Sequence, residues 1–195
     1  MKSWNLLVAL ACATVAHSPA YSKGIAAQDN PEISALFNAD QAARENIKPE
    51  QFKAKAFVSR IIADDHARRE RTQMLLQQDK LKTADDFYHA AFIFQHGNAA
   101  SDYLLAHTLA LAAAARGRKD AAWIAAATLD RYLQTIGQKQ IYGTQYLNRR
   151  ETGPTMELYD RTLVPDPLRE ALGVPPQVKQ EERLQTLKSS GALTP

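Results

Sequence analysis

The sequence predicts a mainly α-helical fold in which antiparallel helical hairpins surround a buried central helix, with a small β-hairpin near the C-terminal third. Apolar residues recur at helical spacing along most of the chain, and glycines follow the ends of several of these segments. The segment 83–145 is apolar at most positions until Gly137, after which the residues alternate as in strands.

Prolines mark the first two helical segments. Asn30 before Pro31 predicts an N-cap and a helix that runs to about Asn46. Pro49 predicts a second helical stretch that continues through Leu76, as one long helix or as two.

Opposite charges four residues apart recur on these segments. They pair Asp40 with Arg44, Asp64 with Arg68, and Asp65 with Arg69. We expect the Asp40 pair to lie on the surface, where such a pair contributes a few tenths of a kcal/mol. Of the other two, we expect at least one near the edge of the core.

The predicted central helix begins after Thr83, which can cap it together with Asp86, and ends at Gly97. Its residues are apolar almost all round, so we expect burial on most sides. Two further helices follow. One is capped by Asn98 or Ser101 and stopped by Gly117, and the other runs from an Asp120 cap to Ile136.

The C-terminal third is predicted to hold the β-hairpin and two helices. Residues 140–146 and 156–159 form the expected strands, joined by a turn near 152–154. A short helix follows from 165 to 172, and a last polar helix from 177 to 188.

The N-terminal residues have the pattern of a secretory signal peptide. Lys2 precedes a short apolar run, then Ser18-Pro19 and small residues, which predicts cleavage after Ala20 or Ser22 and a periplasmic or secreted protein. The run is too short to span a bilayer, so we expect no transmembrane segment in the mature chain. We therefore divide the sequence into signal peptide 1–22, tether 23–29, a single helical domain 30–188 and a flexible tail 189–195.

Cysteine content and charge narrow the function classes. Cys12 is the only cysteine and lies in the predicted signal peptide, so the mature chain has no disulfide and no cysteine metal ligand. The residues before Cys12 fit a lipoprotein motif poorly, which disfavours a lipid anchor. The net charge of +3 falls to +2 without Lys2. Basic and acidic residues alternate along the helices, which argues against nucleic acid.

Polar residues among so many apolar ones are the candidate functional residues, because an unpaired buried polar group is costly. For ligand binding we select Gln95, Arg131, Gln140, Thr144, Gln145 and Arg44. An acid–base site would use His96, His107 and Asp130. A metal site, which the sequence does not favour because it has no local histidine pair, would use His89, His96, His107 and Asp130. Alternatively, each histidine is a structural residue that donates to a carbonyl or a carboxylate.

Several of these residues belong to a wider pattern: Gln95-His96-Gly97, Asp102 to His107 (DYLLAH), Asp130 to Leu133 (DRYL) and Gly143-Thr144-Gln145. In this pattern the chain resembles an uncharacterised family of mostly bacterial proteins, known as a domain of unknown function. The resemblance covers most of the mature chain. It implies one domain and transfers no activity.

The sequence thus predicts an exported helical domain that binds a polar small molecule or a protein partner in a cleft lined by His, Asp, Arg and Gln. Two alternatives stay open: a hydrolase-type enzyme using His96, His107 and Asp130, with or without a metal, and a protein-interaction module of helical-hairpin type. Whether the protein is an enzyme, and which cofactor it would use, is undetermined, since the sequence requires none.

Overall fold

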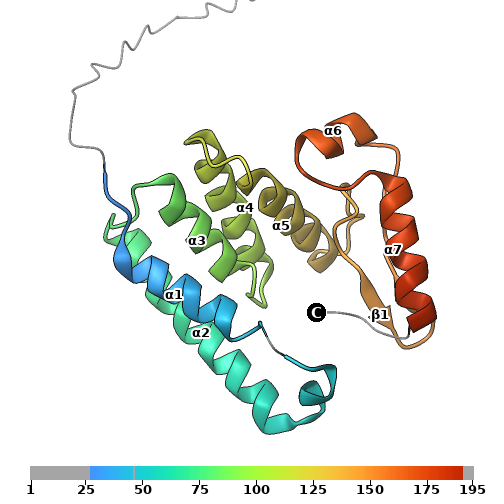
Figure 1. The fold of residues 1–195 in the computed structure, drawn as a ribbon, viewed down its shortest axis with the longest axis horizontal. Helices are drawn as coiled ribbons and strands as arrows, with labels where there is room; N and C mark the ends of the chain where they lie inside the picture. Colours follow the sequence, from blue (N-terminus) through green and yellow to red (C-terminus); the bar gives the residue numbers. More distant parts are fainter. Residues whose placement is uncertain (1–26, 46, 191–195) are drawn as a thin grey trace, which may run out of the picture.

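The computed structural model describes residues 27–45 and 47–190, which form a mainly helical fold with one two-stranded antiparallel sheet (Figure 1). The predicted fold class is confirmed. In chain order the elements are α1 (Pro31–Ala42), the 3-10 helix η1 (Pro49–Lys53), α2 (Lys55–Gln77), α3 (Ala84–Phe94), α4 (Ala100–Ala115), α5 (Ala121–Thr135), β1 (Leu147–Arg149), β2 (Gly153–Thr155), α6 (Asp166–Ala171) and α7 (Gln177–Ser190).

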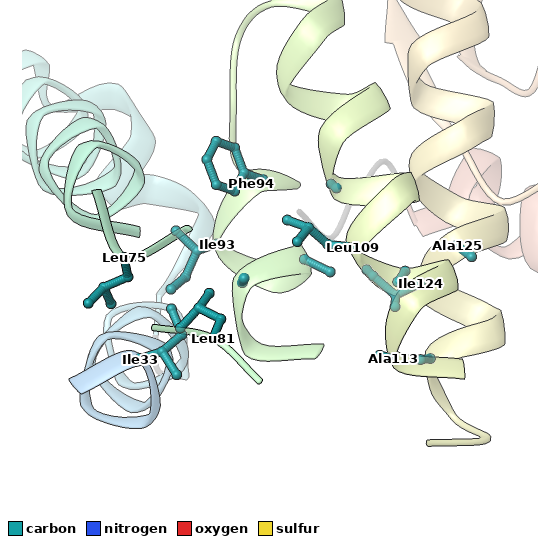
Figure 2. Packing of buried hydrophobic residues seen from close by; sticks show 14 residues of the cluster. Ile33, Leu75, Leu81, Ile93, Phe94, Leu109, Ala113, Ile124 and Ala125 are labelled. Carbon is teal, nitrogen blue, oxygen red and sulfur yellow. The ribbon is translucent and has the colours of Figure 1, made fainter. Parts of the chain in front are cut away.

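Helix α3 is the centre of the fold. It packs against α1, α2, α4 and α5. Ile93 and Phe94 of α3 are buried in a core that also holds Ile33 of α1, Leu75 of α2 and Leu109 of α4 (Figure 2). Many α4 and α5 positions in this core are alanines, which let neighbouring helices approach closely.

The two predicted caps at the start of α1 and α3 are both present and connected to each other. The Asn30 side chain accepts from the backbone N–H groups of Glu32 and Ile33. Thr83 and Asp86 form the reciprocal capping box of α3. Asp86 is fully buried and its Oδ1 also accepts from the Asn30 N–H at 2.7 Å, which fixes the start of α1 on α3.

The predicted cap residue of α4 is wrong, and that of α5 is right in position only, since Asp120 is the N-cap residue of α5. Ala99 is the N-cap residue of α4, and the side chain that accepts its N–H is Asp102, three residues on. Asp120 makes no capping hydrogen bond at the start of α5, because its carboxylate pairs with Arg118 instead.

The β-hairpin exists but is displaced along the chain from the predicted strands. Its register pairs Leu147 with Thr155 and Arg149 with Gly153. The predicted first strand, residues 140–146, is a loop apart from Gln140, which forms an isolated parallel bridge with Tyr159. Three of its backbone N–H groups donate to the carboxylate of Asp130, so they are not available to a strand ladder.

The C-terminal helix α7 packs against β2 and completes a second, smaller core. Leu184 of α7 lies in this core with Met156 and Tyr159, and the half-buried Tyr146 packs against it. In Figure 1, α6 and α7 lie on the far side of α5 from α1 and α2. Residues of the C-terminal third, from the 143–146 loop to α7, line a cleft together with α5.

The predicted signal peptide, with Cys12, lies outside the described residues, as does most of the predicted tail. Within residues 27–45 and 47–190, no helix is both long and apolar enough to cross a membrane.

Candidate functional site

Asp130 on α5 organises the loop that follows its helix. Its side chain is fully buried, and its two carboxylate oxygens accept four hydrogen bonds. Oδ1 accepts from the N–H groups of Ile141 and Tyr142 at 2.8 and 3.0 Å. Oδ2 accepts from the N–H and the hydroxyl of Thr144, each at 2.9 Å. Asp130 is therefore a structural anchor of the loop, with its carboxylate fully engaged.

Gln140 and Gln145 fix the other end of this loop. Gln140 is fully buried; its amide donates to the carbonyls of Gln145 and Met156, and its carbonyl accepts from the Gln145 N–H. The Gln145 amide in turn donates to the Ala127 carbonyl at 3.1 Å. These contacts leave the side-chain oxygen Oε1 of Gln145 pointing at Arg131, whose Nε donates to it at 3.1 Å.

Gly143 lies where the loop meets α7. Its φ of +79° is in the left-handed region, and a Cβ at this position would lie 2.2 Å from Oε1 of Gln180 and 2.5 Å from the Tyr159 hydroxyl. Gln180 is buried and donates to the Tyr142 carbonyl at 2.8 Å. Only glycine satisfies both the backbone conformation and this close approach.

Arg131 is the charged group at the inner side of the cleft. Besides its bond to Gln145, its Nη1 donates to the Gln95 carbonyl at 2.7 Å. Burial lowers the pKa of this guanidinium from its usual value. Within the described part of the chain, Arg131 has no carboxylate partner and its Nη2 has no hydrogen-bond acceptor.

The cleft has a volume of about 320 Å³, at the lower end of small-molecule sites. Its walls come from α5, the 143–146 loop, the residues before α7, and α7 itself. The lining residues include no Asp or Glu; they are Gln95, Trp123, Ala127, Arg131, Gly143, Thr144, Gln145, Tyr146, Pro175, Lys179, Gln180, Arg183 and Leu187.

A second polar cluster lies between α1, α2 and the end of α3. Asp40, expected on the surface, is 1% exposed, so that prediction is wrong. Arg44 bridges Asp40 and Asp65, with 2.7 Å contacts to both carboxylates. Arg68 donates to Asp65 at 2.6 Å, and Nε2 of His96 lies 3.5 Å from Asp40. The four-residue spacing of Asp40 and Arg44 did not indicate burial, because Asp65 and Arg68 of α2 join this pair only when α1 and α2 pack together.

The protonation states in this cluster follow from burial. Burial, followed by the positive charge of Arg44, lowers the pKa of His96 to about 3, so its imidazole is neutral at pH 7. Burial also raises the pKa of Asp40, against the opposing effect of Arg44 and Arg68. For Asp65, burial is outweighed by the hydrogen bonds from Arg44 and Arg68, and its pKa is lowered.

Three backbone carbonyls directly after α3 join the two polar regions. Arg131 binds the Gln95 carbonyl, Arg69 binds that of His96 at 2.8 Å, and the Tyr103 hydroxyl binds that of Gly97 at 2.7 Å. Arg69 does not pair with Asp65 as its spacing predicted, because Asp65 takes Arg44 and Arg68 instead.

The histidines of the acid–base and metal hypotheses have separate partners. Nδ1 of His107 lies 2.9 Å from the Ala125 carbonyl, and His89 stacks on Phe37 with ring centroids 4.3 Å apart. The carboxylate nearest His96 is Asp40, while Asp130 binds the loop. Among the residues that the structure describes, no three His, Cys, Asp or Glu side chains form a group that could hold a metal.

Of the six predicted ligand-binding residues, Gln95, Arg131, Thr144 and Gln145 line the cleft. Gln140 lies behind the loop as a buried support, and Arg44 belongs to the second cluster. Sequence reasoning missed Trp123 of α5 and the α7 residues Lys179 and Arg183. Pro175 and Pro176 followed by polar residues predicted the helix that carries Lys179 and Arg183, but this pattern does not show which side of that helix faces a cleft.

Comparison of the chain with models of known protein families, with curated proteins and with solved structures finds no match. The contacts, charges and cleft described above are therefore the basis on which a function can be proposed.

Proposed function

We propose that this protein is an exported helical domain that binds a small anionic molecule in the cleft between α5, the 143–146 loop and α7. The export part of the proposal rests on the signal-peptide pattern of residues 1–22. The binding part rests on one observation above all: Arg131 contributes a half-buried positive charge to the cleft without a carboxylate partner in the described chain.

A buried charge without a counter-ion is costly, and a ligand that supplies the missing anion removes part of that cost. The guanidinium is also held in place before any ligand arrives. Gln145 and the Gln95 carbonyl fix two of its nitrogens, and Gln140 fixes Gln145. A preorganised donor binds more tightly because little side-chain freedom remains to be lost.

The charge of the lining residues supports an anionic ligand over a neutral one. Arg131, Lys179 and Arg183 are positive and no lining residue is negative. An anion would therefore be attracted to the cleft, and the volume of about 320 Å³ suits a small metabolite better than a peptide.

Amide NMR titration tests the proposal. We would add acetate, succinate, inorganic phosphate and phenyl phosphate separately to the purified protein and follow the backbone signals of Gly143 to Tyr146. The proposal predicts saturable shifts concentrated on these signals for at least one anion, and their loss in Arg131→Gln. If no anion shifts them at millimolar concentration, or if Arg131→Gln responds as the wild type does, the cleft is not an anion site.

A control separates loss of the site from loss of the fold. Arg149→Gln removes an exposed arginine from β1, outside the cleft lining, and is expected to leave the titration unchanged. Arg131→Lys keeps the charge but not the planar fork, and is expected to bind more weakly than the wild type while remaining folded.

A further inference from the structure

We infer that the ligand of this cleft is an aromatic monocarboxylate, with its carboxylate on Arg131 and its ring between Trp123 on α5 and Leu187 on α7. This inference rests on the proposed anion site and adds the chemical class of the ligand. It combines Arg131, the one cation of the lining that is not exposed to solvent, with the apolar wall beside it.

The head group of the ligand follows from the burial and the partners of the three cations in the lining. Lys179 has Glu182 as a partner at 2.8 Å, and both are exposed to solvent. Arg183 lies over the Tyr146 ring, 5.3 Å from its centroid. Arg131 also lies over a ring, that of Tyr103 at 5.7 Å, but unlike Lys179 and Arg183 it is not exposed to solvent. It has no carboxylate partner among the described residues, and one half-buried positive charge matches one negative charge on the ligand. A guanidinium edge binds the two oxygens of a planar carboxylate well.

The body of the ligand is assigned from the spacing along α5. Trp123, Ala127 and Arg131 follow one another four residues apart and all line the cleft. Eight residues of α-helix span roughly 12 Å, so the indole and the guanidinium lie at opposite ends of one wall. The Trp123 side chain keeps 41% of its surface exposed, although a large apolar side chain at a cleft normally gains from being covered.

The facing wall is also apolar. Leu187 of α7, Pro175 and the Tyr146 ring line the same cleft, and the small Ala127 leaves room between them. A flat ring can occupy this space while its carboxylate reaches Arg131. A sugar or a polyol would leave several hydroxyl groups against these apolar side chains without partners.

The test compares four probes that differ by one feature each: phenylacetate, its neutral amide phenylacetamide, acetate without the ring, and phenyl phosphate with a different anionic head. Dissociation constants come from amide NMR titration of the purified protein, followed at Gly143 to Tyr146. We expect phenylacetate to bind at least about tenfold more tightly than phenylacetamide and than acetate, because each lacks one of the two contacts.

Two variants assign the contacts to residues. Trp123→Ala is expected to weaken phenylacetate to the level of acetate, and Arg131→Gln to the level of phenylacetamide. Leu111→Ala is the matched control, since Leu111 is an exposed apolar residue of α4 outside the cleft lining. Because Trp123 is also partly exposed, its removal leaves the main core intact, and a thermal melt checks this for both variants.

The outcomes separate this inference from the proposed function. If acetate and phenylacetate bind equally, or Trp123→Ala has no effect, the anion site stands and the aromatic ligand is wrong. If phenyl phosphate binds about tenfold more tightly than phenylacetate, the head group is a phosphate and the inference is overturned. If no probe shifts the cleft amides, both the inference and the proposed function fail.

Discussion

Replacing Asp130 by asparagine tests how the cleft loop is held. The substitution keeps the size of the side chain and removes one acceptor oxygen. In the native protein the two oxygens accept four hydrogen bonds, two each. If the NH₂ group takes the place of Oδ1, it faces two N–H groups that it cannot bind. If it takes the place of Oδ2, it can donate to the Thr144 hydroxyl, but the Thr144 N–H is left without an acceptor.

The expected cost follows from these contacts. A buried donor without an acceptor costs about 1–3 kcal/mol, and the better of the two orientations leaves one, so Asp130→Asn should cost about 1–3 kcal/mol. Asp130→Ala, which removes all four bonds and leaves a cavity, should cost about 3–5 kcal/mol, since water can reach part of the opened loop. A domain of ordinary stability still folds after either loss.

Urea unfolding followed by circular dichroism measures these differences as changes in the free energy of unfolding. Asp64→Asn is the control, because Asp64 is an exposed aspartate on α2, and it should change the free energy by less than about 0.5 kcal/mol. If Asp130→Asn is as stable as this control, the loop does not depend on the Asp130 carboxylate and our account of its structure is refuted.

Three other predictions concern the same two polar regions. Gly143→Ala should cost about 1–2 kcal/mol more than Gly137→Ala in urea unfolding, because both have positive φ but only Gly143 lacks room for a Cβ; equal costs would contradict the close approach. Gln140→Leu should cost about 2–4 kcal/mol, because it leaves a buried N–H and two carbonyls without partners; a cost below about 0.5 kcal/mol would contradict this role. The folded protein holds the pKa of His96 at about 3 against 6.5 when unfolded, so the unfolded state takes up this proton first as the pH falls and stability decreases below pH 6.5. Urea titrations at each pH should show that His96→Gln lessens this decrease between pH 6.5 and about 5, by at most about 1.4 kcal/mol per pH unit. The pKa of His89 is also lowered, so His89 should retain its own contribution to the decrease. An unchanged slope of stability against pH in His96→Gln would contradict the burial of His96.

Local signals predicted the helical part of the fold well. Asn30 before proline and the Thr83–Asp86 capping box lie where the structure places the starts of α1 and α3. Such caps need only residues within one turn, so the sequence contains all the information. At the start of α4 the Ala99 N–H donates to Asp102, which lies inside the helix. Asn98 and Ser101 lie near this start in the sequence, but that was not sufficient to identify the cap.

The hairpin shows how a distant group overrides a local pattern. Residues 140–146 alternate as in a strand, but the Asp130 carboxylate takes the N–H groups that a strand would use. The ladder therefore forms further on, at Leu147–Arg149 with Gly153–Thr155. The Asp130 carboxylate lies eleven residues before Ile141 in the sequence, so a prediction from the alternation of residues 140–146 alone could not include it.

The sequence indicated which polar residues are buried or line a site more reliably than it indicated which of them lie together. Four of the predicted ligand-binding residues share one cleft because α5 and the 143–146 loop are connected through Asp130. Arg44 was assigned to the same site, yet its charge is used by Asp40 and Asp65. Which carboxylate reaches which arginine depends on helix packing, and a four-residue spacing indicates only the pairs within one helix.

The most direct test of the account is a crystal structure of the protein with phenylacetate. We predict a carboxylate oxygen about 2.7–2.9 Å from Nη2 of Arg131, with the ring against Trp123 and Leu187. A carboxylate found on Lys179 or Arg183 at the rim, with Nη2 of Arg131 still unoccupied, would contradict the claim that Arg131 is the anion-binding residue of this cleft.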